Sequence, residues 1–180
     1  DGLSLGTGWD DAFASAIALK VIRQVATYAA LTALTADTGL VDAGAYLVRG
    51  RTSNGDGGEG LFRYSSGASD TANGGTILAI DGGGSGRFFR IGHGGILCPE
   101  FFGSSSDWGA ALTAAFTAVA SSGGIVKMRP GSDYSFTTLA SMPATENRVV
   151  WDIRGCIIRA KYASGATFKF GDGVTQVREL

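Results

Sequence analysis

The spacing of hydrophobic positions changes along this chain of 180 residues, and each spacing predicts a different kind of element. In the first segment, large apolar side chains recur at every fourth residue: Trp9, Phe13, Ile17, Val21 and Val25. This spacing keeps side chains near one face of a helix for a few turns. It therefore predicts an N-terminal helix with one apolar stripe. The sequence VIRQVAT at the end of the segment is rich in β-branched residues and favours a strand after the helix.

The apolar stripe of this helix has no later helix of similar length to pack against. The helix can dock on its own domain, pack against copies of itself, or bind an anchoring protein. We assign residues 1–26 to an N-terminal helical segment for anchoring or oligomerisation. Its candidate interface residues are Trp9, Phe13, Ile17 and Val21.

Short β-segments separated by glycine clusters follow. Thr27 can cap a short helix over YAALTAL. The sequences AYLVRG, LFRYSS, TILAI and RFFRIG are each bounded by glycine and predict strands. Asn73-Gly74 is a strong hairpin signal, because both central residues of a type I′ turn need positive φ. We therefore expect a small antiparallel meander at about residues 40–92, within a β-rich domain of residues 27–94.

The sequence SSSDWGAALTAAFTAVASSGG contains the clearest helix of the chain. Ser106 or Asp107 can cap its start, and Gly123 stands where a helix commonly ends. Alanine fills most of the remaining positions. The bulky side chains lie on one stripe and suit a helix lying flat on an apolar surface: Trp108, Leu112, Phe116 and Val119.

After this helix the pattern changes again, to the short strands GIVKMR, DYSFTT, RVVWDI, CIIRA and TFKFG. Short strands at such intervals fit successive rungs of a solenoid. The open end of a solenoid exposes apolar core and must be covered. We therefore expect residues 95–180 to hold a capping helix followed by the first rungs of a β-helix. The predicted fold class is mainly β with short helices.

The amino-acid composition limits the classes of partner that the protein can have. Glycine accounts for 29 residues and charged residues for only 17%, which indicates many tight turns and a surface partly covered by partners. The formal net charge is −1 without a basic cluster, so nucleic acid is excluded as a partner. Apolar runs are too short to span a membrane. Cys98 and Cys156 lack the spacing of a metal site, and we expect free, buried thiols.

The order of motifs carries a resemblance. VATYAALTAL, GDGGEGLFRY, NGGTILAI, GRFFRIG, FFG, a helix and GGIVKMRPGSDYSF follow one another as in the N-terminal parts of phage tail spikes with a pectate-lyase-like right-handed parallel β-helix. The match covers about residues 25–140. Many such spikes have a GDG-x-x-DD turn before the helix, whereas here Phe102-Gly103 leads directly into SSSDWGAAL and only Asp107 remains. The role of those acidic residues is therefore not carried over.

The resemblance implies a homotrimeric spike on a virion, tail or capsid, whose N-terminal residues attach it to neighbouring virion proteins. It also implies that a later part of the chain binds or cleaves host surface polysaccharide. Catalytic carboxylates of such spikes lie further into the solenoid, so we assign none here. The chain begins at Asp1 without methionine, which suggests a piece of a longer protein, and its start lacks the basic segment of a signal peptide.

Several motifs imitate known sites. GDGGEG at residues 55–60 matches GxGxxG, but a strand follows it where a nucleotide site needs a helix. GLSLG at residues 2–6 matches GxSxG without the preceding strand of a nucleophile elbow. His93, the single histidine, is interpreted as a loop residue. We therefore expect no cofactor and no metal.

Carboxylates and aromatic residues leave weaker alternatives open. Asp56, Glu59 and Asp70 could bind calcium, although their spacing matches no calcium loop. Asp133 and Asp152 could form a glycosidase pair if they shared a face. Tyr134 and Trp151 could stack on sugar rings, although core packing suits aromatic residues in strands better.

Three functions follow from these observations. The leading hypothesis is a virion structural protein that anchors a receptor-binding β-helix to the particle for host attachment. The second is a polysaccharide depolymerase, a glycan hydrolase or lyase, whose catalytic part lies beyond Leu180. The third is an independent carbohydrate-binding module that uses the meander as its binding sheet.

Overall fold

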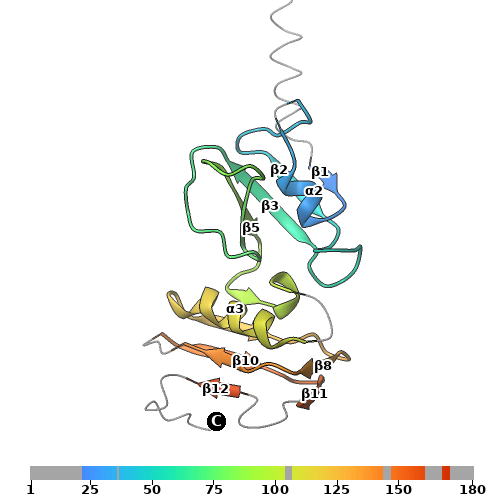
Figure 1. The fold of residues 1–180 in the computed structure, drawn as a ribbon, viewed down its shortest axis with the longest axis vertical. Coiled ribbons are helices and arrows are strands. Elements are labelled where there is room, and N and C mark those ends of the chain that lie inside the picture. Colours follow the sequence, from blue (N-terminus) through green and yellow to red (C-terminus); the bar gives the residue numbers. More distant parts are fainter. Residues whose placement is uncertain (1–21, 36, 104–106, 144–146, 161–167, 171–180) are drawn as a thin grey trace, which may run out of the picture.

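The computed structural model describes residues 22–35, 37–103, 107–143, 147–160 and 168–170. These residues form a mainly β fold with two short α-helices (Figure 1). The predicted N-terminal helix, with Trp9, Phe13, Ile17 and Val21, lies outside the described residues. Of the helices in the described ranges, none is long and apolar enough to cross a bilayer.

The chain enters the described structure through a strand. β1 (Arg23–Val25) confirms the strand expected from VIRQVAT. Val25 is 8% exposed and packs in the first core, so its place in a helical stripe was wrong. α2 (Tyr28–Thr32) then begins at Thr27, whose hydroxyl accepts a hydrogen bond from the Ala30 amide at 3.2 Å. That contact confirms Thr27 as the helix cap.

A five-stranded sheet follows, and its strands match the predicted ones. It contains β2 (Ala45–Val48), β3 (Gly60–Ser65), β4 (Ile77–Ala79) and β5 (Arg87–Ile91) in the order β1-β2-β3-β5-β4. β1 runs parallel to β2, and the other pairs are antiparallel. The sheet is not a simple meander, because β3 pairs with β5 and leaves β4 at the edge.

The predicted hairpin at Asn73-Gly74 is wrong for the same reason, since β3 and β4 are not neighbours. Asn73 instead closes a loop that leads into β4. Its side-chain oxygen accepts hydrogen bonds from the amides of Gly75, Thr76 and Ile77 at 3.1, 2.9 and 3.0 Å. Gly74 has a φ of 75°, so it does adopt the positive φ that a turn at this pair requires.

The first core lies between this sheet and α2. Alternate residues of each strand point inward, and the large aromatic ones are closed off from solvent. Tyr46, Phe62 and Phe88 are 0–2% exposed. The Tyr28 ring meets Phe62 edge-on at 5.5 Å, and Tyr46 meets Phe88 in the same way at 5.6 Å.

Two short elements that were expected to be plain connection join the sheet to the second helix. They are β6 (Ile96–Leu97) and the 3₁₀ turn η1 (Pro99–Phe101). α3 (Gly109–Ala120) is the helix predicted from the alanine-rich segment, and its last turn is followed by Gly123, whose amide donates to the Val119 carbonyl at 2.8 Å. Gly123 has a φ of 73°, so the reversal there favours glycine.

Short parallel strands complete the described fold. They are β7 (Gly124–Lys127), β8 (Asp133–Phe136), β9 (Ala140–Met142), β10 (Val149–Asp152), β11 (Ile157–Ala160) and β12 (Phe168–Phe170). β10 pairs with β7, β11 with β8, and β12 with β9, all parallel, and β6 pairs with the other edge of β7. β9 was not predicted, whereas the other five strands after α3 were.

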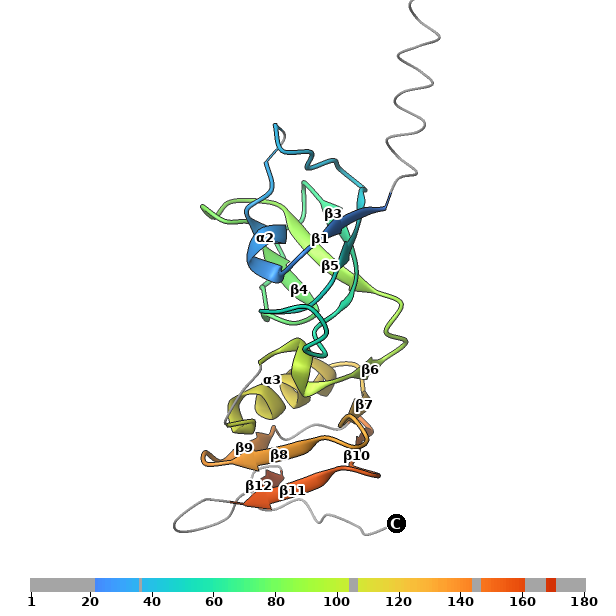
Figure 2. The same cartoon turned by 90° about the vertical axis from the view of Figure 1, so that its right-hand side faces the viewer.

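The second core lies between α3 and these strands. Leu112, Phe116, Val126, Tyr134 and Phe136 are 0–1% exposed within it. Figure 1 and Figure 2 show the resulting order along the long axis: the five-stranded sheet, then α3, then the parallel strands beneath α3. The helix therefore lies between an antiparallel part and a parallel part.

Candidate functional site

The site with the clearest architecture is the junction at which α3 and η1 separate the two cores. The expected cap residues of α3 all contribute to it. Leu112, Phe116 and Val119 are at most 3% exposed, and Trp108 packs against the same cluster from just before the helix. The Phe116 ring meets Trp151 edge-on at 5.8 Å, so the stripe contacts the strands directly.

Hydrogen bonds fasten α3 to the strands at several points. The Trp108 amide donates to the Ser135 carbonyl of β8 at 3.0 Å. The Thr113 hydroxyl accepts from the Ser141 amide of β9 at 2.9 Å. These bonds fix the register between the helix and the parallel strands.

Asp107 provides the acidic group at the start of α3, although Trp108 is the residue at the N-cap position. Its carboxylate accepts from the amides of Gly109 at 3.1 Å, Thr137 at 3.0 Å and Thr138 at 3.3 Å. Burial alone would raise the pKa of Asp107, but these donors hold it well below its ordinary value. The charged carboxylate thus joins the helix start to the loop after β8.

Two arginines that the sequence analysis did not single out connect the first core to η1. The Arg51 guanidinium donates from Nη1 to the carbonyls of Gly74 at 2.5 Å and Phe101 at 2.8 Å. The Arg90 guanidinium stacks on the Phe101 ring, 3.7 Å from its centroid. Phe101 in η1 is therefore held through both its backbone and its ring.

Arg90 is almost completely buried, at 6% exposure. Its guanidinium donates to the carbonyls of Glu59 at 2.7 Å, Gly58 at 2.8 Å and Gly75 at 3.3 Å, and to the Tyr28 hydroxyl. Burial lowers the pKa of Arg90, an effect opposed by the nearby Tyr28. The signal in the sequence was its strand position, since Arg90 follows the inward-facing Phe88 by two residues in RFFRI.

The GDGGEG loop is part of this junction and matches its interpretation as a turn. The Asp56 carboxylate accepts from the amides of Arg51 at 2.8 Å, Thr52 at 2.7 Å, Ser53 at 3.0 Å and Gly58 at 3.0 Å. Burial works to raise the pKa of Asp56, but these amides hold it well below its ordinary value. Its acceptor capacity is thus used to shape the loop.

Glycines of the same loop allow close approach across the junction. A Cβ atom on Gly57 would lie 2.6 Å from Cγ of Glu100, and a Cβ atom on Gly60 would collide with the Arg90 guanidinium. Larger side chains at either position would push the loop away from η1. The loop therefore needs glycine for packing as well as for turning.

Glu100 is the buried acid of the junction, at 4% exposure. The Tyr134 hydroxyl donates to its Oε1 and accepts from the Arg129 amide at 2.7 Å. Its Oε2 has no hydrogen-bond partner in the structure. Burial raises the pKa of Glu100, and the hydrogen bond from Tyr134 opposes this rise only in part. The raised pKa favours the neutral carboxylic acid.

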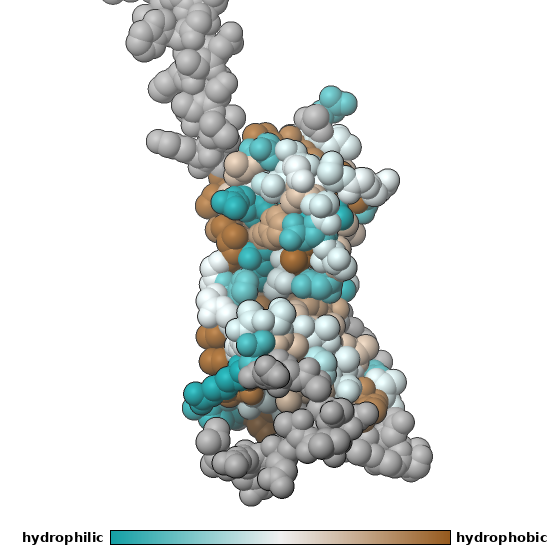
Figure 3. Space-filling model, turned by 90° about the vertical axis from the view of Figure 1, so that its left-hand side faces the viewer, coloured by the Kyte–Doolittle hydropathy of each residue, from teal (hydrophilic) through white to brown (hydrophobic). Residues whose placement is uncertain are grey.

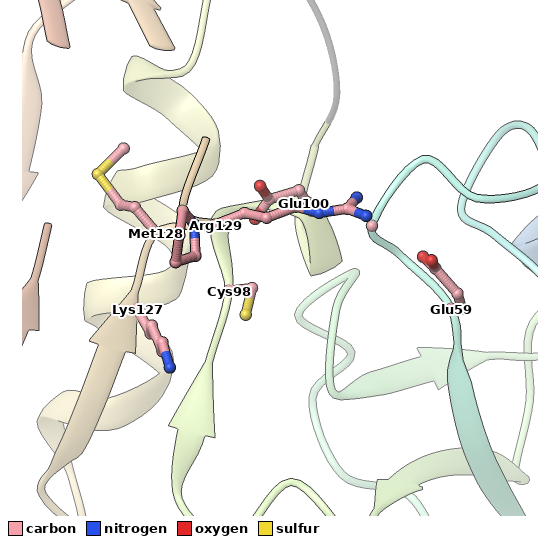
Figure 4. Close-up of a pocket in the computed structure, with 8 residues that line it drawn as sticks. Glu59, Cys98, Glu100, Lys127, Met128 and Arg129 are labelled. Carbon is pink, nitrogen blue, oxygen red and sulfur yellow. The ribbon is translucent and has the colours of Figure 1, made fainter. Parts of the chain in front are cut away.

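A pocket of about 350 Å³ opens beside Glu100. Figure 4 shows Lys127, Met128 and Arg129 on one side, Glu59 on the other, and Cys98 between them. Burial and the neighbouring Glu100 raise the pKa of the Cys98 thiol to about 11, so the thiol is protonated at neutral pH. Cys98 and Cys156 are both free and only half-buried, so they are less enclosed than expected.

The other candidate residues do not assemble into a reactive site. Asp133 of β8 pairs with Arg159 of β11 at 2.5 Å, whereas Asp152, the last residue of β10, pairs with Arg154 at 2.7 Å. The two carboxylates therefore belong to different sheets. Within the described ranges, no three His, Cys, Asp or Glu residues are grouped to hold a metal ion.

The remaining sequence candidates are structural. Tyr134 is fully buried, and Trp151 packs against Phe168 with ring centroids 4.9 Å apart, so both belong to the second core. His93 accepts a hydrogen bond at Nδ1 from the Gly95 amide at 3.2 Å. Burial and the nearby Arg90 lower the pKa of His93, which favours the neutral ring. The interpretation of His93 as a loop residue is confirmed.

No protein-family model matches the chain, and no curated protein matches it. Its fold, however, is similar to solved phage tailspikes. The enzymatically active domain of tailspike protein 4 from bacteriophage CBA120 aligns with a TM-score of 0.60 and 12% identity, over 93% of this chain and 23% of that one.

Two Acinetobacter phage proteins give the same result. The tailspike gp49 of Acinetobacter baumannii bacteriophage Fri1, a capsular polysaccharide depolymerase, aligns with a TM-score of 0.55 and 15% identity, over 88% of this chain and 26% of that one. The tailspike of Acinetobacter baumannii phage AM24 aligns with a TM-score of 0.52 and 20% identity, over 90% and 30%. This chain thus has a tailspike-like fold and spans less than a third of each of these proteins.

Proposed function

We propose that this chain is the particle-proximal part of a homotrimeric phage spike or fibre, which attaches a receptor-binding β-helix to the virion for binding host polysaccharide. The observation that carries the proposal is the position of α3. The helix lies between an antiparallel sheet and a stack of parallel strands, and it covers the apolar end of that stack. A lid of this kind is what an open solenoid requires at its first rung.

We further propose that residues 95–180 begin a right-handed parallel β-helix and that residues 27–94 form a separate head-binding or neck-like domain. The pairing of Val149 with Gly124, Ile157 with Asp133 and Phe168 with Ala140 supports the first part, because each later strand lies on an earlier one in parallel. Two distinct buried clusters support the second part. Residues 1–26 would then join the spike to neighbouring virion proteins.

Electron microscopy of the longest native product tests this proposal. We expect an elongated particle with threefold symmetry, and on virions the end that carries residues 27–94 should face the particle. A globular monomer without threefold symmetry would contradict the proposal. Gel filtration separates it from an independent carbohydrate-binding module, which should run as a monomer.

A second candidate function is a polysaccharide depolymerase, in which these residues support a catalytic part located further along the protein. The specific observation in its favour is that one similar structure is described as an enzymatically active domain and another as a capsular polysaccharide depolymerase. We expect the 180-residue chain to release no reducing ends or unsaturated sugars from host polysaccharide, whereas the longest native product should do so if this second function holds.

A further inference from the structure

Apolar side chains cover part of the outer face of the five-stranded sheet. Leu47 of β2, Leu61 of β3 and Ile91 of β5 are direct neighbours in the strand register. Leu47 is 37% exposed and Ile91 is 39% exposed, although both lie within hydrogen-bonded strands of the sheet. They form a row across the face that points away from the first core.

A second row continues on the parallel strands. Ile96 of β6 pairs with Ile125 of β7, and Ile125 pairs with Val150 of β10. Ile96 is 39% exposed, and the other two are partly exposed. Only Gly92–Gly95 separates Ile91 in the first row from Ile96 in the second. We call the two rows together the aliphatic strip: Leu47, Leu61, Ile91, Ile96, Ile125 and Val150.

Other outward positions of the same strands include charged residues, since Arg63 on β3 and Lys127 on β7 are exposed. Outside the strip, Asp133 of β8 and Arg159 of β11 form an ion pair. A sheet with one face in water normally alternates apolar and polar residues in this way. The aliphatic strip departs from that rule at both rows, and apolar residues grouped on a surface in this way mark an interaction site. Figure 3 shows hydrophobic residues along one edge of both parts of the molecule.

We propose that the aliphatic strip is the surface through which copies of this chain pack side by side. This inference rests on the proposed homotrimer and names the face that would form it. The strip belongs to both parts of the molecule, so copies related by a threefold axis along the long axis carry the same two rows at the same heights. Strips that face this axis can therefore meet one another. A sugar chain would instead need polar and aromatic groups, which the strip lacks.

The chain outside the described residues points to the same partner. Its predicted helical stripe of Trp9, Phe13, Ile17 and Val21 ends directly before Ile22, which is 52% exposed. β1 follows at once, and its Gln24 pairs with Leu47 of the strip. Copies held together by the predicted helix would therefore approach one another at the first row.

Sedimentation of matched double variants of the 180-residue chain tests the inference. Leu47→Glu with Ile96→Glu places a charge in each row. Leu139→Glu with Ile157→Glu makes the same change at aliphatic residues that are 38% and 53% exposed but lie off the strip. We expect the first pair to raise the concentration for half-dissociation by about 100-fold or more, because a buried charge without a partner is costly. The control pair should leave it within about twofold of the wild type.

The outcomes separate the inference from the proposed function. A trimeric wild type whose mass survives the strip variant would overturn the inference and leave the spike proposal standing. A wild type that is monomeric at every concentration would overturn the homotrimer and, with it, the inference.

Photo-crosslinking decides the case in which the strip variant does not fold. A benzoylphenylalanine introduced at residue 47 should crosslink copies of the chain, and one at residue 157 should not. Equal crosslinking at both positions, or none at 47, would overturn the inference.

Discussion

At the scale of single residues, the junction depends on charged groups that are enclosed by backbone. Arg90 donates mainly to carbonyl oxygens of the glycine-rich loop, and Asp56 accepts only from N–H and hydroxyl groups of residues 51–58. Buried charges are tolerated when hydrogen bonds replace water around them. Glycine is needed where the loop meets these side chains, as at Gly57 and Gly60. Many other glycines between strands adopt positive φ instead.

Gly60→Ala tests this role of glycine. The new Cβ would collide with the Arg90 guanidinium and displace one of its hydrogen bonds. We expect the free energy of unfolding to fall by about 1–3 kcal/mol, as for other overpacked positions. Urea denaturation measures the change. Gly67→Ala is the matched control, because no heavy atom lies within 4 Å of its new Cβ. Equal effects of the two substitutions would contradict the proposed packing.

Glu100→Gln tests the neutral carboxylic acid. Burial raises the pKa of Glu100 above its ordinary value of 4.5, so the folded protein keeps a proton that the unfolded chain releases as the pH rises. The contribution of this proton to the free energy of unfolding is fully present below pH 4.5. It is lost as the pH rises through the pKa that Glu100 has in the folded protein. Because glutamine stays neutral, we expect the variant to gain stability relative to the wild type from about pH 4.5 upward.

Urea titrations of both proteins between pH 4 and pH 8 measure this difference. Glu59→Gln controls for removing a carboxylate at the exposed rim of the same pocket. A difference between Glu100→Gln and the wild type that is the same at every pH would show that the carboxyl is not shifted.

At the scale of elements, α3 shows what a sequence pattern can and cannot predict. Its stripe was readable because Leu112, Phe116 and Val119 repeat at helical spacing and the polar positions do not interrupt it. The strands from β7 onward were readable for a similar reason, because glycine and charged residues separate short apolar runs. Which strands pair with each other was harder to predict, because nothing in the local sequence indicates that β3 pairs with β5 and not with β4.

The junction itself was the least predictable part of the fold. Arg51 and Arg90 are far apart in the sequence and match no motif, so only the folded chain shows that both contact Phe101. β9 was missed because Ala140–Met142 contains no β-branched or aromatic residue, unlike the equally short β12. η1 was missed because a single 3₁₀ turn has no repeating pattern of its own. A charged residue at an inward strand position, as in RFFRI, is the one local signal that was available.

Phe116→Ala tests the contact between α3 and the strands. The ring is 1% exposed and meets Trp151, so its removal leaves a cavity in the second core. We expect a loss of about 3–5 kcal/mol in the free energy of unfolding. Thr117→Ala, on the exposed face of the same helix, should change it by less than about 0.5 kcal/mol. Chemical denaturation followed by tryptophan fluorescence compares the two, and similar values would contradict the packing of α3 on the strands.

At the scale of the whole molecule, the described residues form two cores connected at one junction and aligned along one axis. Such an arrangement suits an elongated part that holds the segments at its two ends at a fixed distance and orientation. Its low charge content and its exposed aliphatic strip both favour assembly over an isolated existence.

Phe13→Glu with Ile17→Glu tests the predicted N-terminal helix as an assembly element. The two charges fall on its apolar stripe, so we expect a lower average mass in sedimentation velocity. The thermal unfolding midpoint of the monomeric fraction should stay the same, because both cores lie within residues 25–168. An unchanged mass would assign the helix to packing within its own chain.

The contacts of Arg51 have a consequence for how freely the two parts of the chain can vary in sequence. Across the junction its guanidinium binds the Phe101 carbonyl, a group that any amino acid would supply. This contact, unlike the stacking of Arg90 on the Phe101 ring, therefore does not depend on which side chain stands at residue 101. We expect that the segment after Gly95 can be replaced by one of different sequence without loss of the junction, provided that a planar ring remains available to stack on Arg90.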